Sequence, residues 1–352
     1  MRGRRKMAKY ATLKDVAERA GTTAATVSYV LNETKGRYIS EDMKKRVLEA
    51  AEELNYVKSS VASSLKGKKR KMIAVLVPQF ANQFFTRIVL AIEKVADQYG
   101  YILSTCNTFD DVKREKEILS RMQQQRVDGY IIIPTKDGTK NTKQLRQVEI
   151  PMVVVDRSLE NVKDYFWVTT DNYQCGYMGT QHLIDNGHEH IAYIGWDSGI
   201  PDLVARQVAF YKALEENGIE KEKSMVVNGE FTEEAGYQMT KELLEGHKEI
   251  TALFYGYNIQ AKGGVQYLRE QGMQAGKDIS VVLIGSPEWA SVGNNSYTHV
   301  DQRDYQLGTT AAKLLFEILN SEQKVKSKRI LLDCFLVEGN SVKNITNRER
   351  VL

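Results

Sequence analysis

The chain has 352 residues, of which 42% are hydrophobic and 27% charged, values typical of a soluble protein with two or three domains. It has no apolar run long enough for a transmembrane helix, and the start MRGRRKM lacks the apolar stretch of a secretory signal. The net charge of +4 is unevenly distributed, because residues 1–71 carry 18 Lys/Arg against 8 Asp/Glu and the remainder 31 against 37. This segregation is the electrostatic footprint of phosphate binding, because an ordinary solvated basic face does not explain a segregated excess of this size.

Residues 11–32, ATLKDVAERAGTTAATVSYVLN, have the pattern of a helix-turn-helix. A first helix is expected after Thr12, a good N-cap, and Gly21 lies where the chain turns with positive φ. Thr22 or Thr23 is expected to cap the second helix, whose outer face is small and polar enough to enter a major groove. An ordinary helix pair would show the same periodicity. The basic charge of this region favours DNA.

A third helix is expected from Ile39 to Asn55, with Ser40 as its cap, which completes a small domain over 11–57. Residues 58–71 have few large apolar side chains and end in a basic run, so they predict a linker that is also a marginal helix.

From Met72 onward, short β-branched runs alternate with amphipathic helices, a pattern typical of parallel sheets covered by helices on both faces. The predicted strands are 73–77, 101–105, 130–133, 152–155, 191–195, 225–228, 252–255 and 279–285. So many strands favour two subdomains with a cleft, and ligands of such folds lie beyond the carboxyl ends of the strands. The sequence lacks GxGxxG after a strand and GxxxxGK[ST], so nucleotide binding by those motifs is not expected.

The cysteines and histidines predict neither a metal site nor a cofactor. Cys106, Cys175 and Cys334 are far apart and odd in number, which favours reduced thiols in a cytoplasm. His188 and His190 are placed on the same side of a strand, but two ligands make a poor metal site. No catalytic triad or nucleophile elbow is evident, so an α/β enzyme is a distant alternative.

Taken together, the segments TLKDVAERAG, TVSYVLN, VASSLK, RVDGYII, IPMVVVDR, DNYQCGYMGTQHLIDNGHEHIAYIG and DISVVLIG closely resemble the lactose-repressor/galactose-repressor (LacI/GalR) family, from Ala11 to about Gly339. The resemblance implies an all-α helix-turn-helix domain and a hinge helix. They precede an α/β core of two Rossmann-like subdomains, like a periplasmic sugar-binding protein. It further implies a cytoplasmic repressor, most readily of a carbohydrate operon. Such a homodimer binds pseudopalindromic operator DNA and takes a small-molecule effector in its cleft.

The resemblance also implies DNA-contacting roles for individual residues. Ala24, Ala25 and Tyr29 match the positions that read base edges, and Tyr29 stands where many relatives carry arginine or histidine. Bidentate guanine readout by arginine is therefore absent at that position. Leu65 matches the leucine that relatives insert into the minor groove. The full expected set is Thr12, Leu13, Thr23, Ala24, Ala25, Thr26, Ser28, Tyr29, Asn32, Lys35, Arg37, Tyr38 and Leu65.

For the cleft, the resemblance implies stacking on Phe84 and Phe85 and a hydrogen-bonding fork from Arg206. The residues expected to bind effector are Phe84, Phe85, Asp156, Arg157, Trp196, Arg206, Phe231, Tyr257, Asn258, Glu288 and Trp289. Any one of the aromatic residues would also fit a packing role.

Two departures weaken the sugar interpretation. Relatives usually carry aspartate where this chain has Asn258, and an aromatic residue with aspartates where it reads Ser286, Pro287 and Glu288. The carboxylate clamp for a pyranose is therefore missing or rebuilt from Glu288 and Asn258. A non-sugar effector and a phosphoprotein corepressor remain alternatives.

The expected organisation is a basic arm (1–10), a DNA-binding domain (11–57), a hinge (58–71), an effector-binding and dimerisation domain (72–340) and a tail (341–352). Within the fourth part, one subdomain is expected over 72–170 and 299–325 and the other over 171–298 and 326–340. The dimer interface is expected along 87–96 and 114–122, although Ile88, Ala91, Ile92 and Val95 fit a core equally well.

Overall fold

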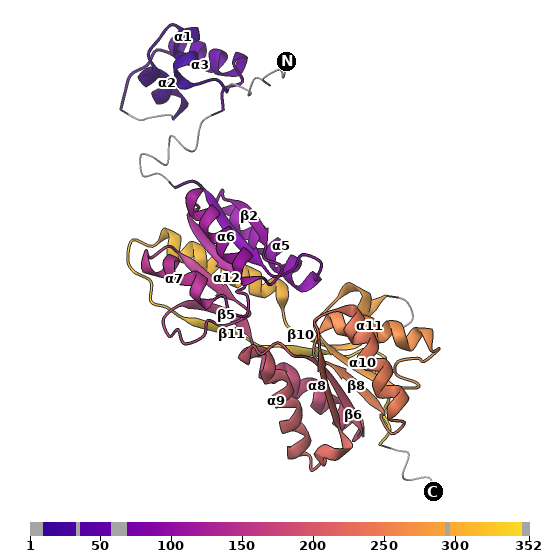
Figure 1. Ribbon diagram of the computed structural model, residues 1–352. Helices are drawn as coiled ribbons and strands as arrows, with labels where there is room; N and C mark the ends of the chain where they lie inside the picture. Colours follow the sequence, from indigo (N-terminus) through magenta and orange to yellow (C-terminus); the bar gives the residue numbers. More distant parts are fainter. Residues whose placement is uncertain (1–9, 33–35, 58–68, 293–295, 347–352) are drawn as a thin grey trace, which may run out of the picture. The chain divides into compact units, whose positions relative to one another are not determined.

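The computed structural model describes residues 10–32, 36–57, 69–292 and 296–346 (Figure 1). It divides into two compact units, Met1–Arg70 and Lys71–Leu352. Lys35, Leu65 and nearly all of the expected basic arm and hinge lie outside the described residues. In the described ranges, no helix has both the length and the apolar character needed to cross a membrane.

The described part of the first unit contains α1 (Leu13–Ala20), α2 (Ala24–Leu31) and α3 (Glu41–Glu53). The predicted caps are present, because the side chains of Thr12, Thr23 and Ser40 each accept a hydrogen bond from a backbone N–H in the first turn of their helix. The buried core includes Val16, Ala17, Ala20, Val27, Val47 and Ala50.

The turn between α1 and α2 requires glycine. Gly21 has φ 65°, as the sequence predicts, and a Cβ at this position would lie 2.7 Å from Arg46 Nη2. Arg46 in turn donates to the carbonyl of Ala20 at 2.6 Å, so α3 holds the C-terminal end of α1.

The second unit has two lobes. The N lobe is built on a sheet of six described strands, all parallel, in the order β11-β5-β4-β3-β1-β2. Its strands are β1 (Met72–Val77), β2 (Ile102–Asn107), β3 (Gly129–Ile132), β4 (Met152–Val155), β5 (Phe166–Thr170) and β11 (Arg329–Leu332). The flanking helices are α5 (Gln83–Gln98), α6 (Val112–Gln124), α7 (Thr139–Gln147) and α12 (Asp304–Asn320).

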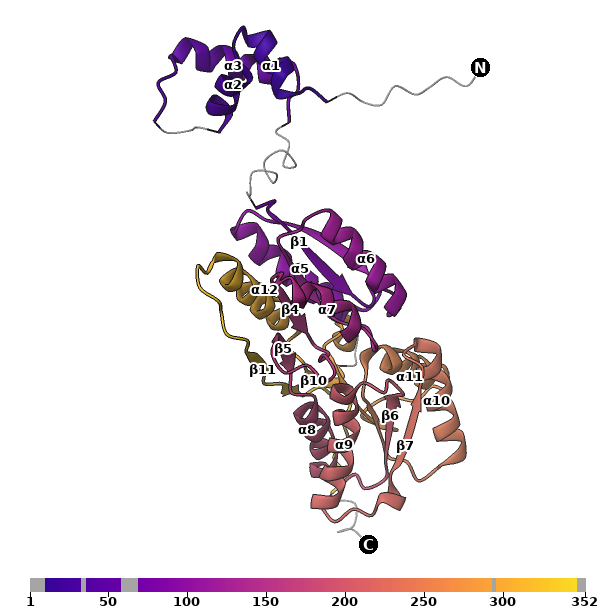
Figure 2. The same ribbon diagram turned by 60° about the vertical axis from the view of Figure 1, so that its left-hand side comes forward.

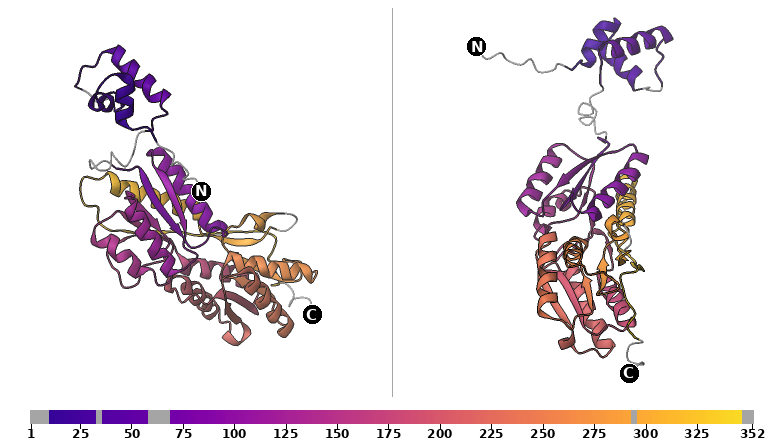
Figure 3. Two further views of the ribbon diagram at one scale, coloured as in Figure 1. Left: turned by 45° about the horizontal axis from the view of Figure 1, so that its top comes forward. Right: turned by 90° about the vertical axis from the view of Figure 1, so that its right-hand side faces the viewer.

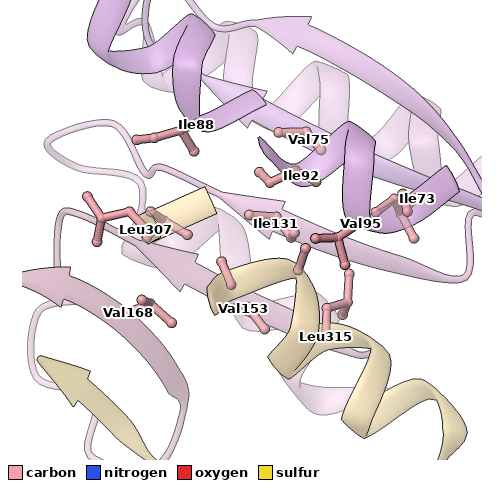
Figure 4. Close-up of a cluster of buried hydrophobic side chains, with 14 of the residues drawn as sticks. Ile73, Val75, Ile88, Ile92, Val95, Ile131, Val153, Val168, Leu307 and Leu315 are labelled. Atoms are coloured by element: carbon pink, nitrogen blue, oxygen red, sulfur yellow. The ribbon is translucent and has the colours of Figure 1, made fainter. Parts of the chain in front are cut away.

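Helices α5 and α12 cover one face of this sheet, and α6 and α7 cover the other. Figure 4 shows the first layer, where Ile88, Ile92 and Val95 of α5 and Leu307 and Leu315 of α12 meet the strands. Ile88, Ala91, Ile92 and Val95 are all buried in this way, so they belong to the core rather than to an exposed interface.

The C lobe has a sheet of six described strands in the order β12-β10-β9-β8-β6-β7, in which β12 runs antiparallel to β10. Its strands are β6 (Ile191–Trp196), β7 (Met225–Gly229), β8 (Ala252–Tyr255), β9 (Ser280–Ile284), β10 (Thr298–Asp301) and β12 (Phe335–Val337). The helices are α8 (Asn172–Asp185), α9 (Pro201–Glu216), α10 (Glu233–Gly246) and α11 (Asn258–Glu270), with short 3-10 turns at Lys221–Lys223 and Glu288–Ser291 (Figure 2).

Three crossovers join the lobes, after β5, after β10 and after β11 (Figure 3). The Thr170 hydroxyl donates to the carbonyl of Gln302 at 2.6 Å, and Asp171 N–H donates to the carbonyl of Leu332 at 3.1 Å. The crossovers are therefore hydrogen-bonded to one another.

All eight strands predicted from the sequence are present, but β5, β10, β11 and β12 were not predicted. The lobe boundaries also differ from those expected, since 299–301 belong to the C-lobe sheet and 329–332 to the N-lobe sheet. β11 (RILL) has only three consecutive apolar residues and lies at the edge of the sheet with no residue fully buried, so its sequence alone does not separate it from a loop.

Candidate functional site

The outer face of α2 is the expected base-reading surface. Ala24 and Ala25 are exposed, and Tyr29 is half-buried with the Arg37 guanidinium 5.1 Å from its ring centroid. The Thr23 and Thr26 hydroxyls lie 3.0 Å apart. This surface offers two methyl groups, a phenol and hydroxyls, with one cation held against the phenol.

The flanking residues are largely held by local hydrogen bonds. The Thr12 hydroxyl donates to Asp15 Oδ2 at 2.8 Å, and the Asn32 amide donates to the Ser28 carbonyl at 2.6 Å. Tyr38 is 97% exposed, and Leu13, the first residue of α1, is half-buried. Thr12 and Asn32 are therefore held by local hydrogen bonds, and the Asn32 amide also donates to the Ser28 hydroxyl at 3.1 Å.

A small cavity of about 30 Å³ lies between the lobes, near the carboxyl ends of the strands. The residues that line it are Asn82, Phe84, Phe85, Asp156, Arg157, Trp196, Leu203, Arg206, Phe231, Tyr257, Asn258, Ile284 and Gln302.

The C-lobe wall of the cavity is aromatic. Trp196 ends β6, and its ring centroid lies 4.8 Å from Phe231 and 5.8 Å from Tyr257. Ile200 and Leu203 pack behind these rings. Such a surface suits the apolar face of a sugar ring or a flat heterocycle.

Arg206 of α9 is buried and held in place by the C lobe itself. Its Nε donates to Asn172 Oδ1 at 2.8 Å and its Nη1 to the Gly256 carbonyl at 2.7 Å, while its guanidinium lies 4.7 Å from the Tyr257 ring centroid. The position of α9 depends on Gly176, where a Cβ would lie 2.2 Å from the Arg206 carbonyl oxygen. Glycine therefore allows α8 and α9 to approach closely enough for this network.

The N-lobe side of the cavity has unsatisfied hydrogen-bonding groups. Asp156 Oδ1, Arg157 Nε and Gln302 Nε2 are buried and have no hydrogen-bond partner among the described residues. Burial raises the pKa of Asp156, while the nearby Arg157 and Arg206 guanidinium groups act in the opposite direction. Asp156 also has φ 64°, uncommon for a residue with a side chain. These atoms offer one acceptor and two donors to a molecule in the cavity.

Several contacts link the lobes beside the cavity. The side-chain amides of Asn82 and Asn258 donate to each other at 3.3 and 3.0 Å, and the Gln83 side chain accepts from Glu288 N–H at 2.9 Å. A cross-lobe cation–π contact places the Arg157 guanidinium 5.5 Å from the Trp196 ring centroid.

Arg87 of α5 also reaches across the lobes. Its Nη1 donates to the Ser286 carbonyl at 3.0 Å, and its Nε lies 3.3 Å from Asp304 Oδ1. Burial raises the pKa of Asp304 to about 6 in spite of this ion pair.

Nine of the eleven residues expected at the effector site line the cavity. The structure places Glu288 and Trp289 elsewhere: Pro287 starts a short turn that leaves the Glu288 side chain exposed, and Trp289 packs on Tyr297 with ring centroids 5.7 Å apart. Sequence reasoning missed Asn82, Leu203, Ile284 and Gln302. Of these, Asn82 is the N-cap of α5. Its position just before the helix that contains Phe84 is a sequence signal that could have identified it.

His188, one of the two histidines considered as metal ligands, is held by structural contacts. His188 lies between the Thr251 hydroxyl at 2.8 Å and the Lys343 carbonyl at 3.0 Å, and burial lowers its pKa. Within the described ranges, no three His, Cys, Asp or Glu side chains form a group that could hold a metal ion.

Comparison with known families gives two matches that cover most of the chain. Residues 12–59 match the model described as bacterial regulatory proteins, lacI family. Residues 70–339 match the model described as periplasmic binding proteins and sugar binding domain of LacI family.

Individual proteins agree with these matches. A ribose operon repressor from Halalkalibacterium halodurans is 33% identical over 307 residues, covering 87% of this chain and 89% of that protein. A lac repressor dimer bound to operator and the anti-inducer ONPF aligns with a TM-score of 0.81 and 28% identity, over 95% of this chain and all of that one. A regulator from Enterococcus faecium with bound ribose aligns with a TM-score of 0.71 and 26% identity, over 78% of this chain and all of that one.

Proposed function

The chain belongs to the LacI family of bacterial regulatory proteins, and from that premise we propose that it is a DNA-binding repressor controlled by a small molecule in the interlobe cavity. The α2 face would contact the major groove of an operator, and residues 58–68 would contribute the hinge. The observation that carries the proposal is the cavity itself. It joins an aromatic wall on one lobe to unsatisfied polar atoms on the other, in a fold that matches effector-responsive regulators.

We propose that the effector is a compact polyol of pentose or hexose size. Three features support this class: a stacking wall of Trp196, Phe231 and Tyr257, an acceptor on Asp156, and donors on Arg157 and Gln302. The reciprocal amide contact between Asn82 and Asn258 closes the region where relatives carry a ligand-binding aspartate. A sugar ring needs more space than the cavity's volume of about 30 Å³, so binding of this class requires the lobes to separate.

We also propose a homodimer in the cytoplasm, where operator DNA is located. The surface near α5 and the β2 edge supports this, because Leu90 is 47% exposed and Ile102 is 62% exposed. Replacing both with aspartate should give a monomer by light scattering, whereas aspartate at the exposed Val148 of the opposite helical layer should leave a dimer.

The cavity lining also fits binding better than catalysis. Among the described residues that line it there is no histidine, cysteine, serine or lysine, so the cavity offers neither a nucleophile nor a base of matched pKa apart from Asp156.

The function is tested by two titrations on one preparation. Fluorescence anisotropy with a duplex selected by the protein from random DNA should show salt-dependent binding that exceeds binding to scrambled DNA by a factor of at least about 10³. A thermal-shift panel of pentoses, hexoses, disaccharides and purines should identify a ligand that raises the melting temperature and changes operator affinity. No preference for any DNA would overturn the regulator proposal. A response confined to a phosphoprotein would replace the polyol with a corepressor.

A further inference from the structure

The charge of the chain changes along its length in a way that the helix-turn-helix does not explain. Residues 1–71 carry an excess of ten cations. The N-lobe segments 72–170 and 302–333 carry 19 Lys/Arg against 16 Asp/Glu, and the C-lobe segments 171–301 and 334–352 carry 12 against 21. The N lobe is thus positive within a second unit that is negative overall.

Seven of the 19 Lys/Arg in the N-lobe segments lie near the N-terminal ends of the strands, where Lys69, Arg70 and Lys71 of the preceding segment join them. All described strands of this sheet are parallel, so all begin at the same edge, and β1 begins there directly after Lys71. We call this edge the entry rim and define it as residues 69–71, 97–102, 126–129, 146–152, 163–166 and 321–329. It carries ten Lys/Arg against five Asp/Glu.

Contacts between the described residues show that segments of the rim adjoin. The Lys71 ammonium donates to the Tyr99 carbonyl at 3.3 Å, and the Tyr99 ring stacks on Phe316 at the end of α12 with centroids 4.3 Å apart. Across the sheet, Lys324 pairs with Glu149 at 2.5 Å. Segments that are distant in the sequence therefore form one surface around the place where the chain enters the lobe.

Among the described residues, the exposed rim cations Arg126, Lys163 and Lys326 have neither an ion pair nor a cation–π contact. Lys71 and Arg329 are exposed too, but their charges lie over the rings of Tyr101 and Trp167. Lys163 shares a groove with Lys328 and Arg329. Lysines beside an edge strand also prevent strand pairing, which accounts for cations next to β11. That role does not account for Arg126, which precedes the central strand β3.

We propose that the entry rim is a second DNA-contacting surface, which binds the phosphate backbone of the duplex that flanks the operator. This inference rests on the proposed DNA-binding function. Residues 58–68 connect Val57 to Lys69, and a segment of that length spans at most about 40 Å when fully extended, so the rim stays within reach of the duplex. B-DNA presents one negative charge about every 1.7 Å, so a row of free cations meets phosphates without reading sequence.

The test compares two DNA lengths with two matched triple variants of the full-length protein. One duplex ends at the outer base pairs of the selected operator, and the other extends it by about one and a half helical turns on each side. The rim variant carries Arg126→Gln, Lys163→Gln and Lys326→Gln. The control carries Lys248→Gln, Arg269→Gln and Lys277→Gln, which removes the same number of exposed charges from the C lobe.

On the long duplex, the rim variant should bind at least about tenfold more weakly than the unmodified protein at low salt. Its slope of log K against log salt should be shallower by about one for each phosphate that the variant no longer neutralises. Its binding to the short duplex should be unchanged, and the control should match the unmodified protein on both. Equal weakening on both duplexes, or equal weakening in the control, would overturn the proposal. Short-duplex binding separates this outcome from failure of the DNA-binding function itself.

Discussion

The two lobes of the second unit have the same strand order in their sheets. They differ in whether the polar groups that line their shared cavity have hydrogen-bond partners. In the C lobe, Arg206 donates hydrogen bonds to Asn172 and Gly256 and lies against the Tyr257 ring of the aromatic wall. In the N lobe, Asp156 and Arg157 retain buried atoms without partners.

This difference indicates that the two lobes contribute different kinds of contact to ligand recognition. The C lobe supplies a pre-organised stacking surface, whose cost of ordering is met during folding. The N lobe supplies the hydrogen-bonding capacity that a ligand must satisfy, since buried polar groups without partners are costly. Substitutions in the two lobes should therefore have different signatures.

The largest effect is expected for Arg206→Met, because two buried acceptors, Asn172 Oδ1 and the Gly256 carbonyl, would lose their donors. Effector affinity should fall about 100-fold, or about 3 kcal/mol, and the melting temperature of the free protein should also fall. Isothermal titration calorimetry and thermal unfolding measure the two quantities. Lys212→Met on the exposed side of α9 is the control, and an unchanged affinity in Arg206→Met would contradict the pre-organised wall.

Asp156→Asn should have the opposite pattern. The amide keeps the shape of the carboxylate but removes a buried charge whose pKa is raised by burial, so the free protein should be as stable as before or more stable. Effector affinity should fall about 10- to 30-fold, or about 2 kcal/mol, since a charged hydrogen bond is lost. If stability rose while calorimetry showed full affinity, Asp156 would not face the ligand.

The variant Asp304→Asn tests how the stability of the contact between the lobes depends on pH. Because burial raises the pKa of Asp304 from 3.8 to about 6, the folded protein holds this proton more tightly than the unfolded chain. The raised pKa of Asp304 stabilises the fold at low pH. This stabilisation, about 3 kcal/mol for that rise in pKa, is lost as pH rises from about 4 to about 6.

Asparagine does not titrate, so urea denaturation of Asp304→Asn should lack this decline. As pH rises through this window, the free energy of unfolding of the variant should therefore increase relative to that of the unmodified protein. A difference that stays constant with pH would show that Asp304 titrates normally.

Trp196→Leu should have the smallest effect, about 1 kcal/mol, because the neighbouring rings of Phe231 and Tyr257 remain. A few-fold loss of effector affinity is expected, with little change in operator binding by the effector-free protein. A loss as large as that of Arg206→Met would mean that stacking, rather than the arginine network, dominates the C-lobe contribution.

The sequence predicts the parts of this molecule whose signals are local. Thr12, Gly21 and Ser40 mark their helix ends through cap and turn chemistry, and the long apolar strands are identified by their composition. The edge strands β11 and β12 depend on pairing with distant segments and have no fully buried residue, so their short apolar runs give no clear local signal.

The same limit applies to the cavity. Asp156, Trp196 and Tyr257 follow recognisable strands, so their place at the carboxyl edge is predictable. Gln302 lies in a crossover, and its position depends on how three chain segments meet. Glu288 was misplaced because the direction of the Pro287 turn is not encoded in residue spacing.

The crossovers have a consequence for biosynthesis. The N-lobe core needs Leu307 and Leu315 of α12 and the strand β11, all of which leave the ribosome after the main body of the C lobe. The first unit is complete within the first fifth of translation and is ready to fold early. A nascent chain therefore has its DNA-binding helices long before its sensor is finished. Premature termination before α12 would release a fragment that has the DNA-binding helices but lacks a complete sensor.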